Sequence, residues 1–243
     1  MKTAWLNLRS EIPERTNAIR AGLEKLGFAV EKGAPASPRA GDIFVTWNRI
    51  NNGNTVANTF QARGNEVLVL ENASWGNGFV GERWLFLNRT FHNTTGLAPI
   101  GGPERWDSLK VELAPWRTGG EETVILAQRG IGSPPVAMPR SWPFDAQRRW
   151  GGRIRVHPGN NPHPVPLAED LKSAKQCVTW SSGSAIEALR LGIPVFSEAP
   201  NWVGAQDNTI AGRLAMFRRL AWNQWRLNEF ASGAAFAWML GRA

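Results

Sequence analysis

The segment that decides the fold of this chain is residues 176–200, QCVTWSSGSAIEALRLGIPVFSEAP. Residues 176–180 form a short apolar run typical of a strand, and residues 181–184 form a polar turn whose hydroxyls can cap a helix. Apolar residues then recur at helical spacing up to Gly192, and residues 193–196 predict a second strand. A strand, a small-residue turn, a helix and a strand make a βαβ unit of a parallel sheet. Such a turn presents backbone N–H groups at the carboxyl edge of the sheet, where α/β folds hold phosphates.

The pattern S-S-G-S-x-x-E-A-L-x-x-G-x-P-V in this segment resembles the donor half of GT-B glycosyltransferases. The resemblance implies that the helix start binds the diphosphate of a nucleotide sugar, through Ser181, Ser182, Gly183 and Ser184. It also implies that Glu187, one turn later, binds the ribose hydroxyls. Two alternatives stay open: the turn is an ordinary βαβ turn with a capping serine, and Glu187 is half of a capping box.

The composition predicts a soluble globular protein. A chain of 243 residues can bury a core as one large domain or as two small ones. No apolar run approaches the length of a bilayer-spanning helix, and the N-terminal sequence lacks the apolar centre of a signal peptide. The single cysteine, Cys177, excludes an internal disulfide and a cysteine-based zinc site, and we therefore expect a cytoplasmic protein with an inert thiol.

The charge is strongly basic. The net charge is +8, and only 6 of the 28 basic residues are lysines, which leaves 22 arginines. Arginine favours forked contacts with phosphate and stacking on flat rings. Thirteen tryptophans accompany these arginines, as stacking surfaces or as core volume. Two interpretations follow: a polyanionic partner such as DNA, or a basic soluble protein whose scattered arginines have no common ligand.

The first part of the chain predicts a Rossmann-like domain. Strands are predicted at residues 3–8, 28–31, 42–47 and 66–70, with a helix from Pro13 to Leu26 and another ending near Arg63. The strand DIFVTW is apolar enough to be central in a parallel sheet. Whether residues 81–96 form strands or a lid is left open by their alternation.

The second part predicts another Rossmann-like domain. Strands at 123–127 and 153–156 and helices at 141–152 and 167–174 precede the organising segment. Residues 101–120 are rich in Gly, Pro and Trp, which is typical of a linker. Residues 209–230 predict one long helix that packs back on the first domain. The predicted fold is therefore α/β and GT-B-like, with two Rossmann-like domains facing a central crevice: an acceptor domain at 1–118, a donor domain at 119–208 and a C-terminal helix at 209–243.

Two basic side chains are predicted to serve the donor. Arg129 lies in the glycine turn after strand 123–127, and His157 ends the strand 153–156 in a His-Pro pair. This strand end resembles GT-B enzymes that build Kdo-containing capsule linkers, and the related sugar-nucleotide epimerases. The resemblance implies that His157 lies against the donor phosphates, where an imidazole can stabilise charge on the leaving group. A surface histidine before a proline turn is the alternative.

The first domain offers candidates for the base and for the acceptor site. Capsule Kdo transferases carry an E-D-G-F-like motif after the equivalent strand, and L-E-N-A-S-W is similar to it, with Asn72 in place of the second acid. Glu71 is the predicted base, unless it is a strand-end glutamate in a salt bridge, and His92 is a second candidate. The acceptor is predicted to contact the crevice edge at Trp47, Asn48, Arg49 and Trp75.

The predicted reaction needs no metal or cofactor, because the sequence has no D-x-D triplet after a strand and no histidine–carboxylate cluster with metal-ligand spacing. The expected donor is a UDP-sugar. The acceptor placed first is a hydroxymethylated base, of the 5-hydroxymethylcytosine type, in bacteriophage DNA, since the basic charge favours DNA and the phage enzymes are similar in fold. The alternatives are a capsule or lipopolysaccharide-type glycan, a sugar-nucleotide epimerase, and a nucleic-acid-binding module without activity. The sequence does not fix the oligomeric state.

Overall fold

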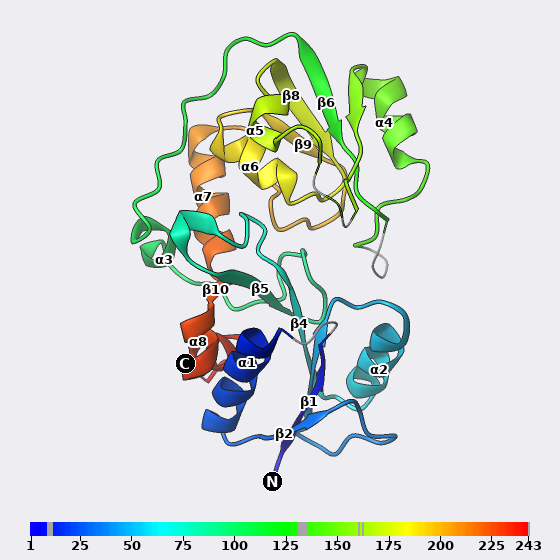
Figure 1. Cartoon of the computed structure of the whole chain (residues 1–243), viewed down its shortest axis with the longest axis vertical. Helices are drawn as coiled ribbons and strands as arrows, with labels where there is room; N and C mark the ends of the chain where they lie inside the picture. Colours follow the sequence, from blue (N-terminus) through cyan, green and yellow to red (C-terminus); the bar gives the residue numbers. More distant parts are fainter. Residues whose placement is uncertain (9–11, 131–135, 160, 162, 243) are drawn as a thin grey trace. The chain divides into compact units, whose positions relative to one another are not determined.

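The computed structural model describes residues 1–8, 12–130, 136–159, 161 and 163–242. The chain divides into two compact units: unit 1 comprises Met1–Gly101 and Ala221–Ala243, and unit 2 comprises Gly102–Leu220. Each unit has its own sheet with flanking helices (Figure 1). The divisions fall after Gly101 and after Leu220, whereas the sequence-based boundaries lie at 118 and 208.

Unit 1 contains a six-stranded sheet in the order β10-β5-β4-β3-β1-β2. Its parallel part comprises β1 (Thr3–Asn7), β2 (Ala29–Lys32), β3 (Ile43–Trp47) and β4 (Glu66–Asn72). β5 (Trp84–Arg89) runs antiparallel to β4, and β10 (Gln224–Arg226) runs antiparallel to β5. The undecided segment 81–96 thus contributes a strand and the loop that follows it. A 3-10 turn (Phe79–Gly81) precedes β5.

Helices cover both faces of the unit 1 sheet (Figure 1). α1 (Pro13–Lys25), α8 (Leu227–Ser232) and α9 (Ala234–Met239) pack on one face, where Leu6, Val45 and Leu70 supply the core. α2 (Asn51–Ala62) covers the other face through Phe60, which stacks on Phe44. All five residues of β3 are buried, so the strand is central, as its apolar sequence predicts.

Unit 2 contains a four-stranded parallel sheet in the order β7-β6-β8-β9. The strands are β6 (Glu122–Leu126), β7 (Arg153–Arg155), β8 (Ala174–Thr179) and β9 (Val195–Ser197). α4 (Trp142–Trp150) packs on one face, while α5 (Leu167–Asp170), α6 (Ser184–Arg190) and α7 (Ile210–Ala221) lie on the other (Figure 1). The predicted βαβ unit of residues 176–200 is present as β8, α6 and β9.

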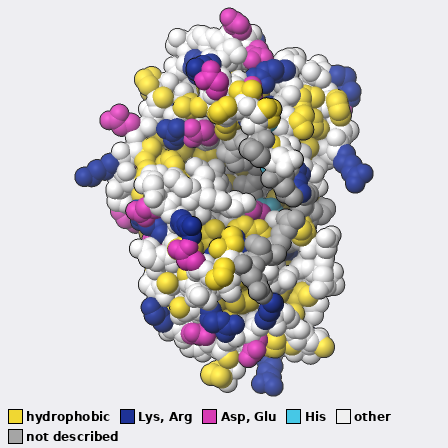
Figure 2. All heavy atoms as spheres, viewed as in Figure 1, with side chains coloured by type: hydrophobic (Ala, Val, Ile, Leu, Met, Phe, Trp, Pro, Cys, Tyr) yellow, Lys and Arg dark blue, Asp and Glu magenta, His cyan; other side chains and the backbone are white. Residues whose placement is uncertain are grey.

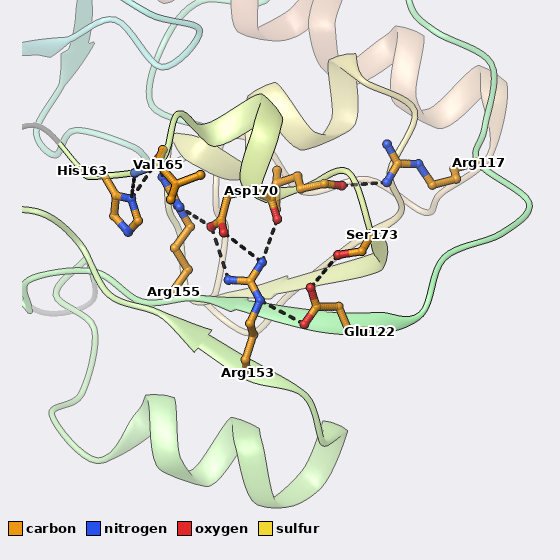
Figure 3. A network of polar contacts seen from close by, with 9 residues as sticks. Arg117, Glu122, Arg153, Arg155, His163, Val165, Asp170 and Ser173 are labelled. Atoms are coloured by element: carbon orange, nitrogen blue, oxygen red, sulfur yellow. Dashed lines mark hydrogen bonds and ion pairs between the residues drawn. The ribbon is translucent and has the colours of Figure 1, made fainter.

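A network of charged side chains ties the start of this sheet to α5 (Figure 3). Arg153 Nε donates to Glu122 Oε2 at 2.9 Å, and its guanidinium also pairs with Asp170. Arg155 forms a second ion pair with Asp170, and Ser173 Oγ donates to Glu122 Oε1 at 2.8 Å. The network therefore joins the amino ends of two strands to the segment that leads into β8.

The predicted linker is instead a strap packed on unit 2. Its short helix α3 (Glu104–Asp107) stacks Trp106 on Phe217 of α7, with ring centroids 4.5 Å apart. Further along, the Ala114 N–H donates to the Arg190 carbonyl at 3.1 Å, and the Arg117 N–H donates to the Gly192 carbonyl at 2.7 Å. A Gly/Pro-rich composition indicates irregular backbone, but long-range hydrogen bonds decide whether that backbone is free or docked.

The predicted long helix at 209–230 is wrong. The helix ends at Ala221, and the chain then forms β10 and α8. Asn223 pairs with Leu87 of β5 in both directions, because its carbonyl accepts from the Leu87 N–H at 2.8 Å and its Nδ2 donates to the Leu87 carbonyl at 3.0 Å. This tertiary strand pairing overrides the local helical pattern. Among the described helices, none combines the length and the apolar character needed to cross a bilayer.

Candidate functional site

The carboxyl ends of the four parallel strands of unit 2 share one edge of the sheet. The strand order reverses between β6 and β8, because β7 lies outside β6 and β9 lies outside β8. In open α/β sheets, ligands bind at this edge and at this reversal. The segments that leave β6 and β8 begin with Ala127 and Trp180, so Gln128 and Ser181 both lie at the point where the strand order reverses.

A side-chain bridge joins these two segments. Gln128 Oε1 accepts the backbone N–H of Ser181 at 2.8 Å, and Gln128 Nε2 lies 3.2 Å from Ser181 Oγ. The turn is braced further by Thr179 Oγ1, which accepts from the Ser182 N–H at 2.9 Å, and by Ser182 Oγ, which accepts from the Ser184 N–H at 3.2 Å. Ser181 and Ser182 are buried, whereas Gly183 is exposed. The serine turn is therefore held in one conformation before any ligand arrives.

Glu187 is bound by Arg190, the residue three positions later in α6. Arg190 Nε donates to Glu187 Oε2 at 2.7 Å and Nη2 donates to Oε1 at 2.5 Å, a forked pair that raises the pKa of the Arg190 guanidinium. The N-cap residue of α6 is Gly183, which has no side chain to form the reciprocal pair of a capping box with Glu187. The capping-box alternative for Glu187 is therefore not what this structure contains.

Arg129 and His157 bring positive charge to the same edge. Partial burial of the ring lowers the pKa of His157, and the positive charge of Arg129 lowers that pKa further. His157 Nδ1 accepts the Gly159 N–H at 2.9 Å, which assigns the proton of the neutral ring to Nε2. Nε2–H is then a donor, and both side chains are exposed. The edge thus combines two basic groups with the serine turn.

A carboxylate that the sequence analysis did not single out lies after β9. Glu198 accepts hydrogen bonds from Trp142 Nε1 at 2.8 Å and Trp150 Nε1 at 3.1 Å, and it pairs with Arg149. Burial would raise the pKa of Glu198, but these donors bring it below the usual range. Glu198 also lines a pocket of about 220 Å³. The other lining residues are Trp150, Val195, Phe196, Ser197, Trp202, Gly204, Ala205 and Gln206.

In unit 1, the strand order reverses between β1 and β3, and two of the predicted acceptor residues end β3 at this edge. Trp47 is mostly buried and lies under the guanidinium of Arg15, whose Cζ is 4.1 Å from the ring centroid. Asn48 has a left-handed backbone (φ 60°), and its Oδ1 is buried with no hydrogen-bond partner in the described structure. A buried acceptor without a donor is unfavourable by about 1–3 kcal/mol, so this atom is suited to a ligand hydroxyl.

The other two predicted acceptor residues, Arg49 and Trp75, are buried and contact other side chains of unit 1. The Arg49 guanidinium is buried and donates to Asn54, Asn58 and the Thr90 carbonyl. Trp75 is buried and stacks on Phe79 with ring centroids 4.9 Å apart. Both side chains are committed to the interior of unit 1, and we do not carry them forward as acceptor contacts.

The two predicted bases, Glu71 and His92, lie toward opposite ends of β4. Glu71 lies near the end of β4, opposite Phe86 of β5, and its Oε1 accepts the Asn72 N–H at 2.8 Å. Because β5 is antiparallel, the segment that carries His92 leaves the sheet where β4 begins. Burial lowers the pKa of His92 to about 4, and its buried Nδ1 has no partner in the described structure. His92 is a core histidine with a weakly basic ring, and the prediction that it serves as a base is not carried forward.

Most of the arginines that suggested DNA are paired with acceptors within the chain itself. Carboxylates or backbone carbonyls hold Arg20, Arg49, Arg83, Arg89, Arg117, Arg148, Arg149, Arg153, Arg155, Arg190, Arg213, Arg218, Arg219 and Arg226. The tryptophans are buried or half-buried, and none is exposed. Figure 2 shows Lys and Arg side chains scattered over the visible face among neutral and apolar atoms. The structure therefore explains much of the composition without a polyanionic partner.

The described residues contain no cluster of three or more His, Cys, Asp or Glu side chains arranged to hold a metal ion. Cys177 is buried in β8, which raises the pKa of its thiol to about 12.

Comparisons with known proteins identify the fold. No protein-family model matches the chain, and no curated protein matches its sequence. A solved structure of KpsC from Thermosulfurimonas dismutans, a beta Kdo 2,4 transferase, is similar with a TM-score of 0.57 and 17% identity, over 93% of this chain and 92% of that chain. The aspartate transcarbamoylase of Trypanosoma cruzi aligns with a TM-score of only 0.27 at 13% identity, over 90% of this chain and 81% of that chain, and carries no argument. The chain thus has an α/β fold similar to that solved structure, with a mixed sheet in unit 1 and a parallel sheet in unit 2.

The sequence analysis did not single out four residues at these edges or in contact with the predicted site residues: Gln128, Arg190, Glu198 and Arg15. Gln128 and Glu198 each follow a predicted strand within two residues, a position that could have flagged them. Arg190 lies three residues after Glu187, a spacing that brings helical side chains together. Nothing in the local sequence distinguishes Arg15, because its contact with Trp47 depends on how α1 packs on the sheet.

Proposed function

We propose that the protein is a nucleotide-sugar-dependent glycosyltransferase of the GT-B type, with its donor bound by unit 2. The observation that carries the proposal is the bridge from Gln128 to Ser181 at the reversal of the unit 2 sheet, with Arg129 and His157 at the same edge. The serine hydroxyls of the braced turn and the two basic side chains beside it suit a diphosphate, which needs hydrogen-bond donors and positive charge.

In the proposed complex, the diphosphate contacts Ser181, Ser182, Gly183 and Ser184, and the ribose hydroxyls contact Glu187. Arg129 and the His157 Nε2–H take up the negative charge that develops on the leaving diphosphate. We propose a UDP-sugar as donor and a reaction that needs no metal ion.

In the proposed reaction, unit 1 binds the acceptor. The buried Oδ1 of Asn48 accepts a hydroxyl of the acceptor, beside the face of Trp47. Glu71 takes the proton of the attacking hydroxyl as its oxygen bonds to the anomeric carbon. The bond between that carbon and the phosphate oxygen breaks, and the nucleoside diphosphate leaves with the electron pair.

For the acceptor, we propose a hydroxyl of a glycan of the capsule or lipopolysaccharide type. The similarity in fold to a Kdo transferase supports this class. The second candidate is hydroxymethylated DNA, and the observation that favours it is the net charge of +8. We place DNA second because most of the arginines are already held by internal acceptors.

The experiment offers the protein a panel of nucleotide sugars, including UDP-hexoses and nucleotide-activated Kdo, with three acceptor conditions. These are Kdo-containing oligosaccharides, DNA containing 5-hydroxymethylcytosine, and no acceptor. Mass spectrometry should detect the gain of one sugar on the oligosaccharide. A gain of mass on the DNA nucleosides would show that DNA is the acceptor. Interconversion of the donor in the absence of an acceptor would identify an epimerase.

Variants in one strand test the proposed base. Glu71→Gln should lower kcat by at least about 100-fold, because positioned general bases contribute at that scale. Glu66→Gln is the matched control, since Glu66 begins the same strand and pairs with Arg89. No transfer by folded wild-type protein to any acceptor would overturn the proposal.

A further inference from the structure

The forked pair between Arg190 and Glu187 fixes the plane of the Glu187 carboxylate. Two N–H donors of one rigid guanidinium each bind a different carboxylate oxygen, at 2.7 and 2.5 Å. Both side chains are partly exposed, with 33% of Arg190 and 26% of Glu187 accessible. A fork of this kind sets direction as well as charge, which a lysine in the same place could not do.

The fork leaves the carboxylate able to accept further donors. Each oxygen of an ionised carboxylate offers two lone-pair sites, and Arg190 uses one site on each. Arg190 lies later in α6 than Glu187, so it approaches from the side away from the carboxyl edge of the sheet. Two acceptor sites in one plane match the two neighbouring hydroxyls of a ribose.

We infer that Arg190 is a positioning residue that makes Glu187 selective for ribonucleotides over 2′-deoxyribonucleotides. The inference rests on the proposed function, in which Glu187 binds the ribose of the donor. A 2′-deoxyribose would leave one of the two aligned oxygens without its donor, next to a guanidinium that prevents the carboxylate from turning to compensate. Without the fork, the carboxylate would rotate and tolerate either sugar.

The strap of unit 2 keeps this end of α6 in place. The Arg190 carbonyl accepts from the Ala114 N–H at 3.1 Å, and the Leu189 carbonyl accepts from Arg213 Nη1 at 3.1 Å. The Arg213 guanidinium lies over Trp116, 4.0 Å from the ring centroid. The backbone that carries Arg190 is therefore held in place before the nucleotide binds, which lowers the entropic cost of positioning the pair.

The test measures binding of ribo- and 2′-deoxyribonucleoside diphosphates by isothermal titration calorimetry. The pairs are UDP with dUDP, CDP with dCDP, ADP with dADP and GDP with dGDP, each to wild type, Arg190→Leu, Arg190→Lys and Glu187→Gln. Wild type should prefer one ribonucleotide over its deoxy form by about tenfold or more, the scale of one hydrogen bond to a charged group. Arg190→Leu should reduce the preference to within about threefold, mainly through weaker ribonucleotide binding. Arg190→Lys should restore it only in part.

The matched control is Arg148→Leu, which removes an i,i+3 partner of Asp145 on α4. Its preference should equal that of wild type, and thermal unfolding should show that each variant is folded. An unchanged preference in Arg190→Leu, with wild type selective, would overturn this inference and leave the proposed function standing. Absence of any nucleotide binding by wild type would overturn both.

Discussion

Gln128 accepts the backbone N–H of Ser181 at 2.8 Å across a sequence separation of 53 residues. The bond joins the ends of two neighbouring parallel strands, and its donor is buried. It fixes the turn that the proposed diphosphate would contact, so Gln128 supports the site although it is not itself a predicted ligand.

Gln128→Leu should destabilise the protein by about 1–3 kcal/mol, because the buried Ser181 N–H would lose its acceptor. Urea unfolding measures this change. Gln128→Glu keeps an acceptor oxygen and should be less destabilising, but its negative charge should weaken nucleotide binding more than the stability loss explains. A Leu variant as stable as wild type would contradict the bracing role.

Arg129→Ala should raise the pKa of His157, because the positive charge of Arg129 disfavours the imidazolium. Part of the depression should remain, since burial of the ring also contributes. Titration of the His157 ring by NMR measures the shift. Arg140→Ala, in the same unit, is the control. Equal His157 pKa values in wild type and Arg129→Ala would show that the two groups do not interact.

His92 should make stability depend on pH. Its pKa is about 4 in the folded protein against 6.5 ordinarily, so between these values the unfolded chain binds a proton that the folded protein does not. Stability should therefore rise with pH across this window, by a total of about 3 kcal/mol from this group. Urea unfolding of wild type and His92→Gln at pH 4.5, 5.5 and 7 tests this. The variant should have the flatter profile, and parallel profiles would contradict the assignment.

Asp170→Asn should be strongly destabilising, by about 3 kcal/mol, because Arg155 would remain buried without its carboxylate (Figure 3). The pKa of Asp170 is lowered, so this stability is present above its usual pKa and is lost as pH falls through the folded value. Glu169→Gln is the control, since its pair with Lys172 is exposed and should contribute less than about 1 kcal/mol. Equal midpoints for the two variants in chemical denaturation would contradict the prediction.

Gly192→Ala should loosen the strap. A Cβ at this position would lie 2.0 Å from the Pro115 carbonyl oxygen, and the backbone has φ +75°. Gly64→Ala is the matched control, since Gly64 has φ +73° with nothing within 4 Å. The control should lose about 1 kcal/mol from backbone strain alone. Gly192→Ala should lose clearly more, and hydrogen exchange should show faster exchange of the Ala114 and Arg117 amides. Equal losses would mean that the close approach to Pro115 is unimportant.

Local sequence predicted most of the parallel strands and the helices between them. The helix α1 has Pro13 at its start and apolar residues at helical spacing, and β3 is a short apolar strand, so each pattern has one regular structure that satisfies it. The serine turn before α6 was predicted in the same way. These elements depend on spacing within a few residues, which the sequence displays directly.

The errors arose where partners distant in the chain decide the structure. Residues 222–226 fit a helical pattern but pair with β5, and the Gly/Pro-rich segment 101–120 docks on α6 and α7. His92 resembles a loop base in sequence, yet it is buried. In each case the competing contact lies far along the chain, so no local pattern reveals it.

The sequence by itself determined the βαβ segment 176–200, the parallel part of each sheet and the small polar residues at one strand end, because hydrophobic period and turn chemistry are local properties. Only the tertiary structure decided that Gln128 holds Ser181 and that the Arg15 guanidinium lies over Trp47. Those pairings depend on strand order and helix packing, which bring together side chains whose separation in sequence gives no sign of contact.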